Sequence, residues 1–172
     1  MESKLKLLGH PIHPMLIVLP LGLLGMSVIF DIIYLITNDP AWTFVAFYMI
    51  GAGVIGGLLA AIFGLLDYLA IPAGTRAKSI GMMHGTGNLV VVILFAVSWW
   101  LRLGTPANPG ITPIILSIAG VLISLGTAWL GGELVDRMHV GVDEGGHLNS
   151  PSSLSGRPAS ESVAGAPGVV AR

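Results

Sequence analysis

The sequence has no cysteine and very little charge. Only 10% of its 172 residues are charged, whereas ordinary soluble domains carry about 25%. The absence of cysteine excludes disulfides, thiolate metal sites, cysteine-held iron–sulfur clusters and cysteine nucleophiles. Hydrophobic residues make up 53% of the chain, and the mean hydropathy is +0.85. A soluble protein of this length could not bury so much apolar surface, and a net charge of −1 gives no indication of nucleic-acid binding.

Four apolar runs are long enough to cross a bilayer, which takes about 20 residues. They are Met15–Ile36, Trp42–Leu66, Ile80–Leu101 and Ile111–Leu130. The connections between them are short, which makes neighbouring helices antiparallel. The sequence therefore predicts an all-α, integral membrane four-helix up-down bundle over residues 1–140, with helices at about 13–36, 42–67, 80–102 and 111–136. Pro20 is expected to kink the first helix.

Basic residues set the expected orientation. Arg102 alone falls at one end of the predicted bundle, and the other five basic residues of this region fall at the opposite end: Lys4, Lys6, Arg76, Lys78 and Arg137. Because cytoplasmic flanks are enriched in Lys and Arg, we expect a multi-pass protein of the inner (plasma) membrane with both termini cytoplasmic. From Gly141 to Arg172 the chain is rich in Ser, Pro, Gly and Ala, which predicts a disordered cytoplasmic tail.

The two halves of the predicted bundle resemble each other. The first and third helices begin near a histidine, His13 and His84, and the second and fourth carry small residues every four positions. This pattern predicts two helical hairpins arranged as a parallel repeat about an axis along the membrane normal. The alternative is that helices rich in Gly and Ala resemble one another by chance.

The predicted topology gathers polar side chains at the cytoplasmic ends of the helices. They are His10, His13, His84 and His139, together with Asp67, Asn88, Glu133 and Asp136. Ionisable groups at membrane depth are costly and are functional candidates by default. Neutral histidines can bind b-type haem or a divalent transition-metal ion. We expect the four histidines to be ligands, and the other four residues to orient them by hydrogen bonding.

Other functions remain open at this point. The polar residues could simply cap helix ends at the interface, or they could form a path for a proton or a small solute. The protein could also be a non-catalytic structural or assembly subunit that binds a partner membrane protein through its Gly- and Ala-rich faces. No HExxH, P-loop or nucleophile-elbow motif occurs, so the sequence points away from an enzyme. His147 lies in the predicted tail and is not expected to take part.

Asp31 is the only charged residue within the first apolar run. At 1.5 Å per residue, it lies roughly 24 Å beyond Met15 along the helix, toward the outer boundary of the membrane. Arg102 is the only basic residue on that side. We predict that Asp31 and Arg102 interact and hold the first helix against the third. The alternative is that Asp31 reaches the headgroups alone, or pairs with Tyr34 or a backbone group.

The opening Gly9-His10-Pro11-Ile12-His13-Pro14 and the run to Gly22 resemble the bacterial membrane family catalogued as domain of unknown function 2231. Gly64-x-x-Asp67, the His84 segment and Leu130–Val135 are also similar to it, so the resemblance covers about residues 7–142. It implies a four-helix integral membrane protein but no established activity. Members occur beside or fused to redox proteins, which favours haem or metal binding and electron transfer. The expected partners are then the lipid bilayer and a membrane redox partner or a second copy of the chain.

Overall fold

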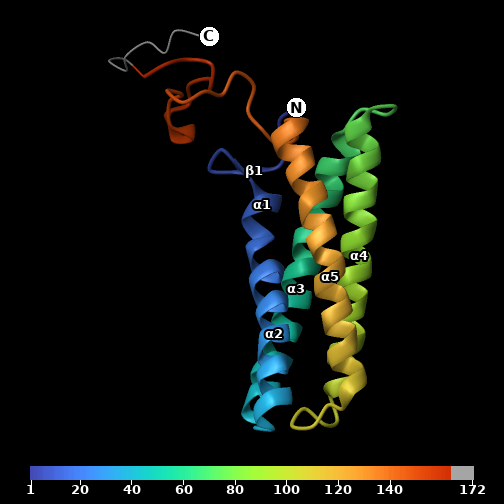
Figure 1. The fold of residues 1–172 in the computed structure, drawn as a ribbon. Helices are drawn as coiled ribbons and strands as arrows, with labels where there is room; N and C mark the ends of the chain where they lie inside the picture. Colours follow the sequence, from blue (N-terminus) through green and yellow to red (C-terminus); the bar gives the residue numbers. More distant parts are fainter. Residues whose placement is uncertain (164–172) are drawn as a thin grey trace.

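Four long apolar helices dominate the computed structural model, which describes residues 1–163. Those long and apolar enough to cross a membrane are Ile12–Thr37, Ala41–Ala70, Arg76–Arg102 and Ile111–Arg137. They run up and down side by side (Figure 1). The structure thus confirms the predicted all-α four-helix membrane bundle. Both described chain ends and the 71–75 loop lie at one end of the bundle, called here the terminal end; the loops at 38–40 and 103–110 lie at the far end.

Pro20 shapes the first of these helices. The span consists of a short helix α1, Ile12–Leu16, and a long helix α2, Val18–Thr37, with a break at Ile17. Proline has no N–H, so the carbonyl of Leu16 cannot receive the usual helical hydrogen bond. The main-chain amide of Ile17 still donates to the main-chain carbonyl of His13, at 3.1 Å. The first span is therefore interrupted for one residue, Ile17, near the proline that the sequence expects to kink it.

The middle two helices are longer than the hydropathy alone indicates. Helix α3 covers Ala41–Ala70 and helix α4 covers Arg76–Arg102. Helix α4 begins four residues before the predicted start because Thr75 caps it: the hydroxyl oxygen of Thr75 accepts a hydrogen bond from the amide of Lys78 at 3.1 Å. A threonine at this position satisfies one of the free amides of the first turn.

The last span ends irregularly. Helix α5 covers Ile111–Gly132 and continues as a π-helical turn, η1, over Glu133–Arg137. Two residues later, His139 has a φ of 53°, a left-handed conformation that non-glycine residues rarely adopt. The chain leaves the bundle here, at the terminal end.

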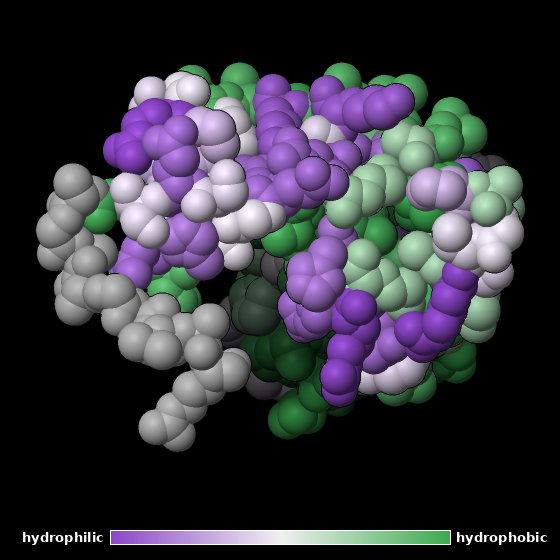
Figure 2. Space-filling model, turned by 90° about the horizontal axis from the view of Figure 1, so that it is seen from above, coloured by the Kyte–Doolittle hydropathy of each residue, from purple (hydrophilic) through white to green (hydrophobic). Residues whose placement is uncertain are grey.

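Helix α2 packs along α3, and α4 packs along α5. The buried core between the helices consists of Leu24, Val28, Ile50, Val54, Val91 and Phe95. Glycines allow this packing: a Cβ atom on Gly120 would lie 2.7 Å from the ring of Phe95. Many large apolar side chains remain exposed on the outside of the helices, where lipid would cover them. In Figure 2, viewed onto the terminal end, hydrophilic residues cover this end and hydrophobic residues surround it.

A small hairpin precedes the bundle and was not predicted. Strand β1, Lys6–Leu7, pairs with strand β2, His10–Pro11, in an antiparallel arrangement. The two turn residues, Leu8 and Gly9, have φ values of 52° and 82°. Positive φ at both central residues is typical of the tightest hairpins, and glycine adopts it without strain.

The structure describes the segment after the bundle as far as residue 163, within the stretch for which the sequence predicts disorder. It forms turns and a short 3₁₀ helix, η2, over Ser153–Ser155. The amide of Gly141 donates to the carbonyl of Met1 at 2.8 Å, and the hydroxyl of Ser153 donates to the carbonyl of Leu8 at 3.1 Å. These polar contacts, rather than an apolar core, position the segment against the hairpin. The remainder of the predicted tail, residues 164–172, lies outside the described residues.

Candidate functional site

His13 lies in the first turn of the first span and contacts α3. Its Nδ1 atom is 2.9 Å from the carbonyl oxygen of Ala60. The ring lies against Gly64, where a Cβ atom would come within 2.8 Å of the ring carbon Cε1. The absence of a side chain at Gly64 is therefore what allows the imidazole to lie close to helix α3.

His84 makes the matching contacts in the second half of the bundle. It lies on α4, and its Nδ1 atom is 2.8 Å from the carbonyl oxygen of Thr127 on α5. A Cβ atom on Gly131 would lie 3.1 Å from Cε1 of this ring. In both halves, the glycine against the ring lies four positions after the residue whose carbonyl the ring contacts: Gly64 after Ala60, and Gly131 after Thr127. This correspondence supports the proposed internal repeat.

The two carbonyl contacts determine which nitrogen of each ring carries the proton. A carbonyl oxygen can only accept a hydrogen bond, so Nδ1 carries the proton in the neutral form of either ring. The lone pair then lies on Nε2, the nitrogen through which each ring could bind a ligand. Metal-binding histidines in proteins are commonly held in this way, with the second nitrogen donating to a carbonyl or carboxylate.

Asn88 makes the two histidines unequal. Its side-chain nitrogen lies 3.0 Å from the carbonyl oxygen of His84 and 3.2 Å from Nε2 of the same ring. Its side-chain oxygen accepts a hydrogen bond from the hydroxyl of Thr127 at 2.8 Å. His13 and His84 are 71 positions apart, and the residue at the same distance before Asn88 is Ile17. Ile17 has no hydrogen-bonding side chain, so His13 has no counterpart of Asn88 at that position. Asn88 thus lies beside His84, where the sequence places it.

The other proposed histidine ligands do not join this pair. His10 lies on β2 and is exposed, with its Nε2 atom 3.4 Å from the hydroxyl of Ser153. His139 is exposed, and its main chain makes two hydrogen bonds: its carbonyl oxygen accepts from the amino group of Met1 at 3.0 Å, and its amide donates to the carbonyl of Val135 at 3.1 Å. Within residues 1–163, no three His, Cys, Asp or Glu residues are close enough to hold a metal ion together. The expected cluster of four histidines is therefore not seen among these residues; His10 lies on strand β2 and His13 on helix α1.

The predicted orienting carboxylates are engaged elsewhere or exposed. Asp67 accepts a hydrogen bond from the hydroxyl of Ser3 at 2.6 Å, and Glu133 pairs with Arg76 at 2.9 Å. Asp136 is exposed on η1. These residues lie beyond the histidines, at the ends of the helices, where the chain termini and loops reach them. Main-chain carbonyls take the role that the sequence assigns to the carboxylates, and no local sequence signal identifies those carbonyls.

Asp31 and Arg102 form a buried ion pair toward the far end of the bundle. These are the two side chains that the sequence predicts to interact. Each guanidinium NH2 nitrogen donates to one carboxylate oxygen, both at 2.7 Å, and both side chains have 0% exposure. The Nε atom of Arg102 also donates to the hydroxyl of Ser98 at 3.3 Å. Ser98 in turn contacts Ser117 at 2.8 Å. These two serines were missed, because an isolated serine in an apolar helix carries no distinctive signal.

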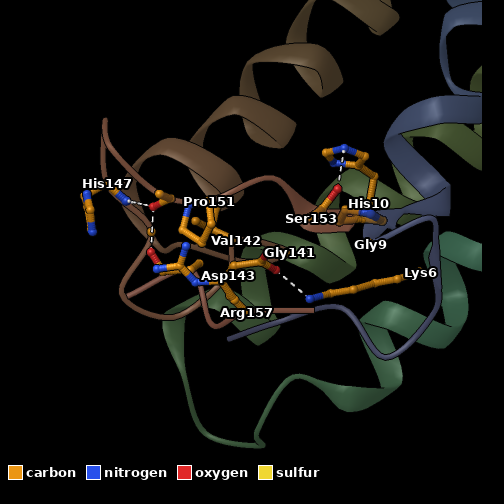
Figure 3. Close-up of a pocket in the computed structure, with 14 residues that line it drawn as sticks. Lys6, Gly9, His10, Gly141, Val142, Asp143, His147, Pro151, Ser153 and Arg157 are labelled. Carbon is orange, nitrogen blue, oxygen red and sulfur yellow. Dashed lines mark hydrogen bonds and ion pairs between the residues drawn. The ribbon is translucent and has the colours of Figure 1, made fainter. Parts of the chain in front are cut away.

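A second polar contact network closes the terminal end. Lys6 pairs with Glu2 and with Asp143, and Glu2 accepts a hydrogen bond from the amide of Glu144 at 3.0 Å. The hydrogen bond from Lys6 lowers the pKa of Glu2, and the bond to Asp143 raises the pKa of Lys6. Beside these residues, a pocket of about 520 Å³ lies between the hairpin and the segment from 141 to 159 (Figure 3). His10, Asp143 and His147 all line the pocket, but among residues 1–163 no three such side chains are close enough together to hold a metal ion.

The pKa shifts predict a pH window for this contact. The lowered pKa of Glu2 stabilises the contact above about pH 4.5, and this contribution disappears as the pH falls through the lowered value. The raised pKa of Lys6 stabilises the contact below about pH 10.5, and this contribution disappears as the pH rises through the raised value. We expect the amide of Glu144 to be protected from hydrogen exchange between these limits.

The measurement is the protection factor of that amide, which corrects for the intrinsic effect of pH on exchange. Glu2→Gln and Lys6→Gln should each reduce it at pH 7. The amide of Ser150, which donates to the carbonyl of His147 at 3.0 Å, serves as the control and should keep its protection. Equal protection of Glu144 in the wild type and in both variants would contradict the prediction.

Comparison with known proteins places the chain in a family. No curated protein and no solved structure matches it significantly. The family model described as predicted membrane protein (DUF2231) matches residues 9–144. This range contains the four spans, His13 and His84, and the Asp31–Arg102 ion pair. Because the match covers well over half of its length, the chain belongs to the DUF2231 family of predicted membrane proteins.

Proposed function

We propose that this membrane protein binds a b-type haem through His13 and His84 and serves in electron transfer. One observation carries the proposal: each ring binds a main-chain carbonyl through Nδ1. That arrangement holds the rings in place and leaves Nε2 with a lone pair. A four-helix bundle with one histidine on each of two helices is a common setting for haem.

The donor set fits haem better than a bare metal ion. Haem iron takes one or two ligands from the protein, and the imidazoles of His13 and His84 would supply two. A divalent ion such as Zn²⁺ requires three or four protein ligands, and residues 1–163 bring no such group together. The bound haem would supply one-electron chemistry. The chain would supply the two ligands, and the Ala60 and Thr127 carbonyls would fix the orientation of the rings.

Asn88 has a specific part in this proposal. Its amide lies 3.2 Å from Nε2 of His84, so it must turn away before His84 can bind iron. The hydroxyl of Thr127 holds the amide oxygen and limits how it can turn. His84 is therefore the ligand whose bond to iron would depend on its neighbours, and His13 is the ligand that is already free.

The structure favours the other candidate functions less. A proton or solute path would need a connection between the histidines and the polar groups around Arg102. Among residues 1–163, the hydrogen bonds that join Asn88 to Thr127 and those that join Arg102 to Ser98 and Ser117 form two separate groups. No described contact favours a purely structural subunit.

An absorption spectrum of the detergent-purified protein, expressed with haem available, tests the proposal. A Soret band with sharp visible bands after dithionite is expected, and metal analysis should find about one iron per chain. A spectrum without a Soret band after reconstitution with hemin would reject haem binding. Another transition metal in stoichiometric amount would favour a metal ion instead.

We also propose that the terminal end faces the cytoplasm of a bacterial inner membrane. Lys4 precedes strand β1, Arg76 begins α4 and Arg137 ends η1, so all three basic residues lie at this end, and such residues are retained on the cytoplasmic side. We expect reporters fused to either terminus to give a cytoplasmic signal. A reporter inserted in the 103–110 loop is the matched control and should give the opposite signal. A periplasmic signal from the C-terminal fusion would reverse the orientation.

A further inference from the structure

The two halves of the chain place similar residues 71 positions apart. Asp31 and Arg102, which contact each other, are separated by this number. The same separation relates three further pairs: His13 and His84, Leu24 and Phe95, and Ser27 and Ser98. In every pair the first residue lies on the first span and the second lies on α4.

The contacts of these residues correspond as well. The two histidine rings each lie on a carbonyl and a glycine of the following helix, as described above. In the core, Leu24 lies against Gly53, where a Cβ atom would come within 2.5 Å of its Cδ2. Phe95 lies against Gly120 in the same way, at 2.7 Å. Gly53 and Gly120 are 67 positions apart, as are the two glycines under the histidine rings.

A pair of corresponding residues can touch only near the axis that relates the two halves. Asp31 on α2 and Arg102 on α4 do so with both side chains fully buried. The axis therefore passes between them. Each hairpin then presents the same kind of surface to the other, with a carboxylate on one and a guanidinium on the other.

We propose that the first hairpin, α1–α3, and the second hairpin, α4–α5, recognise each other through this two-fold surface. The partner that fits each hairpin is one of the same shape with the opposite charge at position 31 or 102. Two carboxylates or two guanidiniums at the axis would repel each other in a buried setting, which disfavours pairing between like hairpins. The charges should therefore be interchangeable between the two positions.

The serines support this interchange. Arg102 donates to Ser98, which precedes it by four residues, at 3.3 Å. Ser27 precedes Asp31 by the same number and is fully buried. An arginine placed at position 31 would thus find a buried hydroxyl in the corresponding place. The inference does not depend on haem binding.

Four full-length proteins test the proposal: the wild type, Asp31→Arg, Arg102→Asp and the double variant. Each single change should reduce the yield of folded, monodisperse protein at least about tenfold, because it leaves two like charges buried together. The double variant should recover to within about twofold of the wild type. The ion pair of the exposed Arg76 with the partly buried Glu133 is the control, and exchanging its charges should change the yield little.

A second exchange avoids charge altogether. Leu24→Phe should overpack the core, Phe95→Leu should leave a cavity, and both should lower the thermal midpoint. The two changes combined should restore it if the positions are related by the axis. Compensation in either exchange supports the two-fold surface. Additive damage in both exchanges, or single charge variants that fold normally, would overturn it.

Discussion

Replacing Asp31 with asparagine is expected to destabilise the bundle by about 3–5 kcal/mol, because it leaves the guanidinium of Arg102 buried without its counter-charge. Both side chains have 0% exposure, and two hydrogen bonds of 2.7 Å join them. Arg102→Gln should have a comparable effect, since the carboxylate then remains buried alone. Such losses are a large part of the stability of a typical domain. The measurement is unfolding of the purified protein in mixed micelles by increasing fractions of SDS.

The double variant Asp31→Asn/Arg102→Gln distinguishes a coupled pair from two independent sites. It removes both charges at once, so its cost should be well below the sum of the two single costs. Arg76→Gln is the matched control. Its partner is Glu133, its side chain is 62% exposed, and its loss should cost about 0–1 kcal/mol. Additive single costs, or an effect at Asp31 no larger than that at Arg76, would contradict a structural role for the buried pair.

Loss of either His13 or His84 should remove the proposed haem. Each alanine variant deletes one of two axial ligands, so the low-spin spectrum should disappear and the affinity for haem should fall by more than about tenfold. His147→Ala and His10→Ala should leave the spectrum unchanged, because both rings are exposed near the pocket at the terminal end. The measurement is a hemin titration followed at the Soret band, with size-exclusion profiles to show that each variant folds.

The glycines beneath the rings provide a test that keeps both ligands. Gly64→Ala would place a Cβ atom 2.8 Å from the His13 ring and should displace it, which would shift the spectrum or weaken binding. Gly85→Ala is the matched control, since no atom lies within 4 Å of the added Cβ. A spectrum unchanged in His13→Ala, in His84→Ala and in Gly64→Ala would remove these residues from the site.

Some features of this molecule follow from the sequence without knowledge of its packing. The four spans are evident because a helix in lipid must be apolar along its whole length, and this property is visible in any window of about 20 residues. The pairing of Asp31 with Arg102 is also accessible. Toward the far end of the spans, Asp31 is the only acidic residue and Arg102 is the only basic residue. A charged side chain within the membrane is costly unless it has a partner, so these two are expected to pair.

The site itself required the packed structure. Whether His13 reaches a carboxylate or the carbonyl of Ala60 depends on how two helices are rotated and staggered against each other, and these two residues are 47 positions apart. The placement of His10 on strand β2 and of His13 on helix α1 depends on a hairpin only two residues long in each strand, too short to produce a periodic signal. Local composition determines which segments enter the membrane, because transfer into lipid is a sum over residues. Contacts between the segments depend on their relative orientation, which becomes defined only when the bundle packs as a whole.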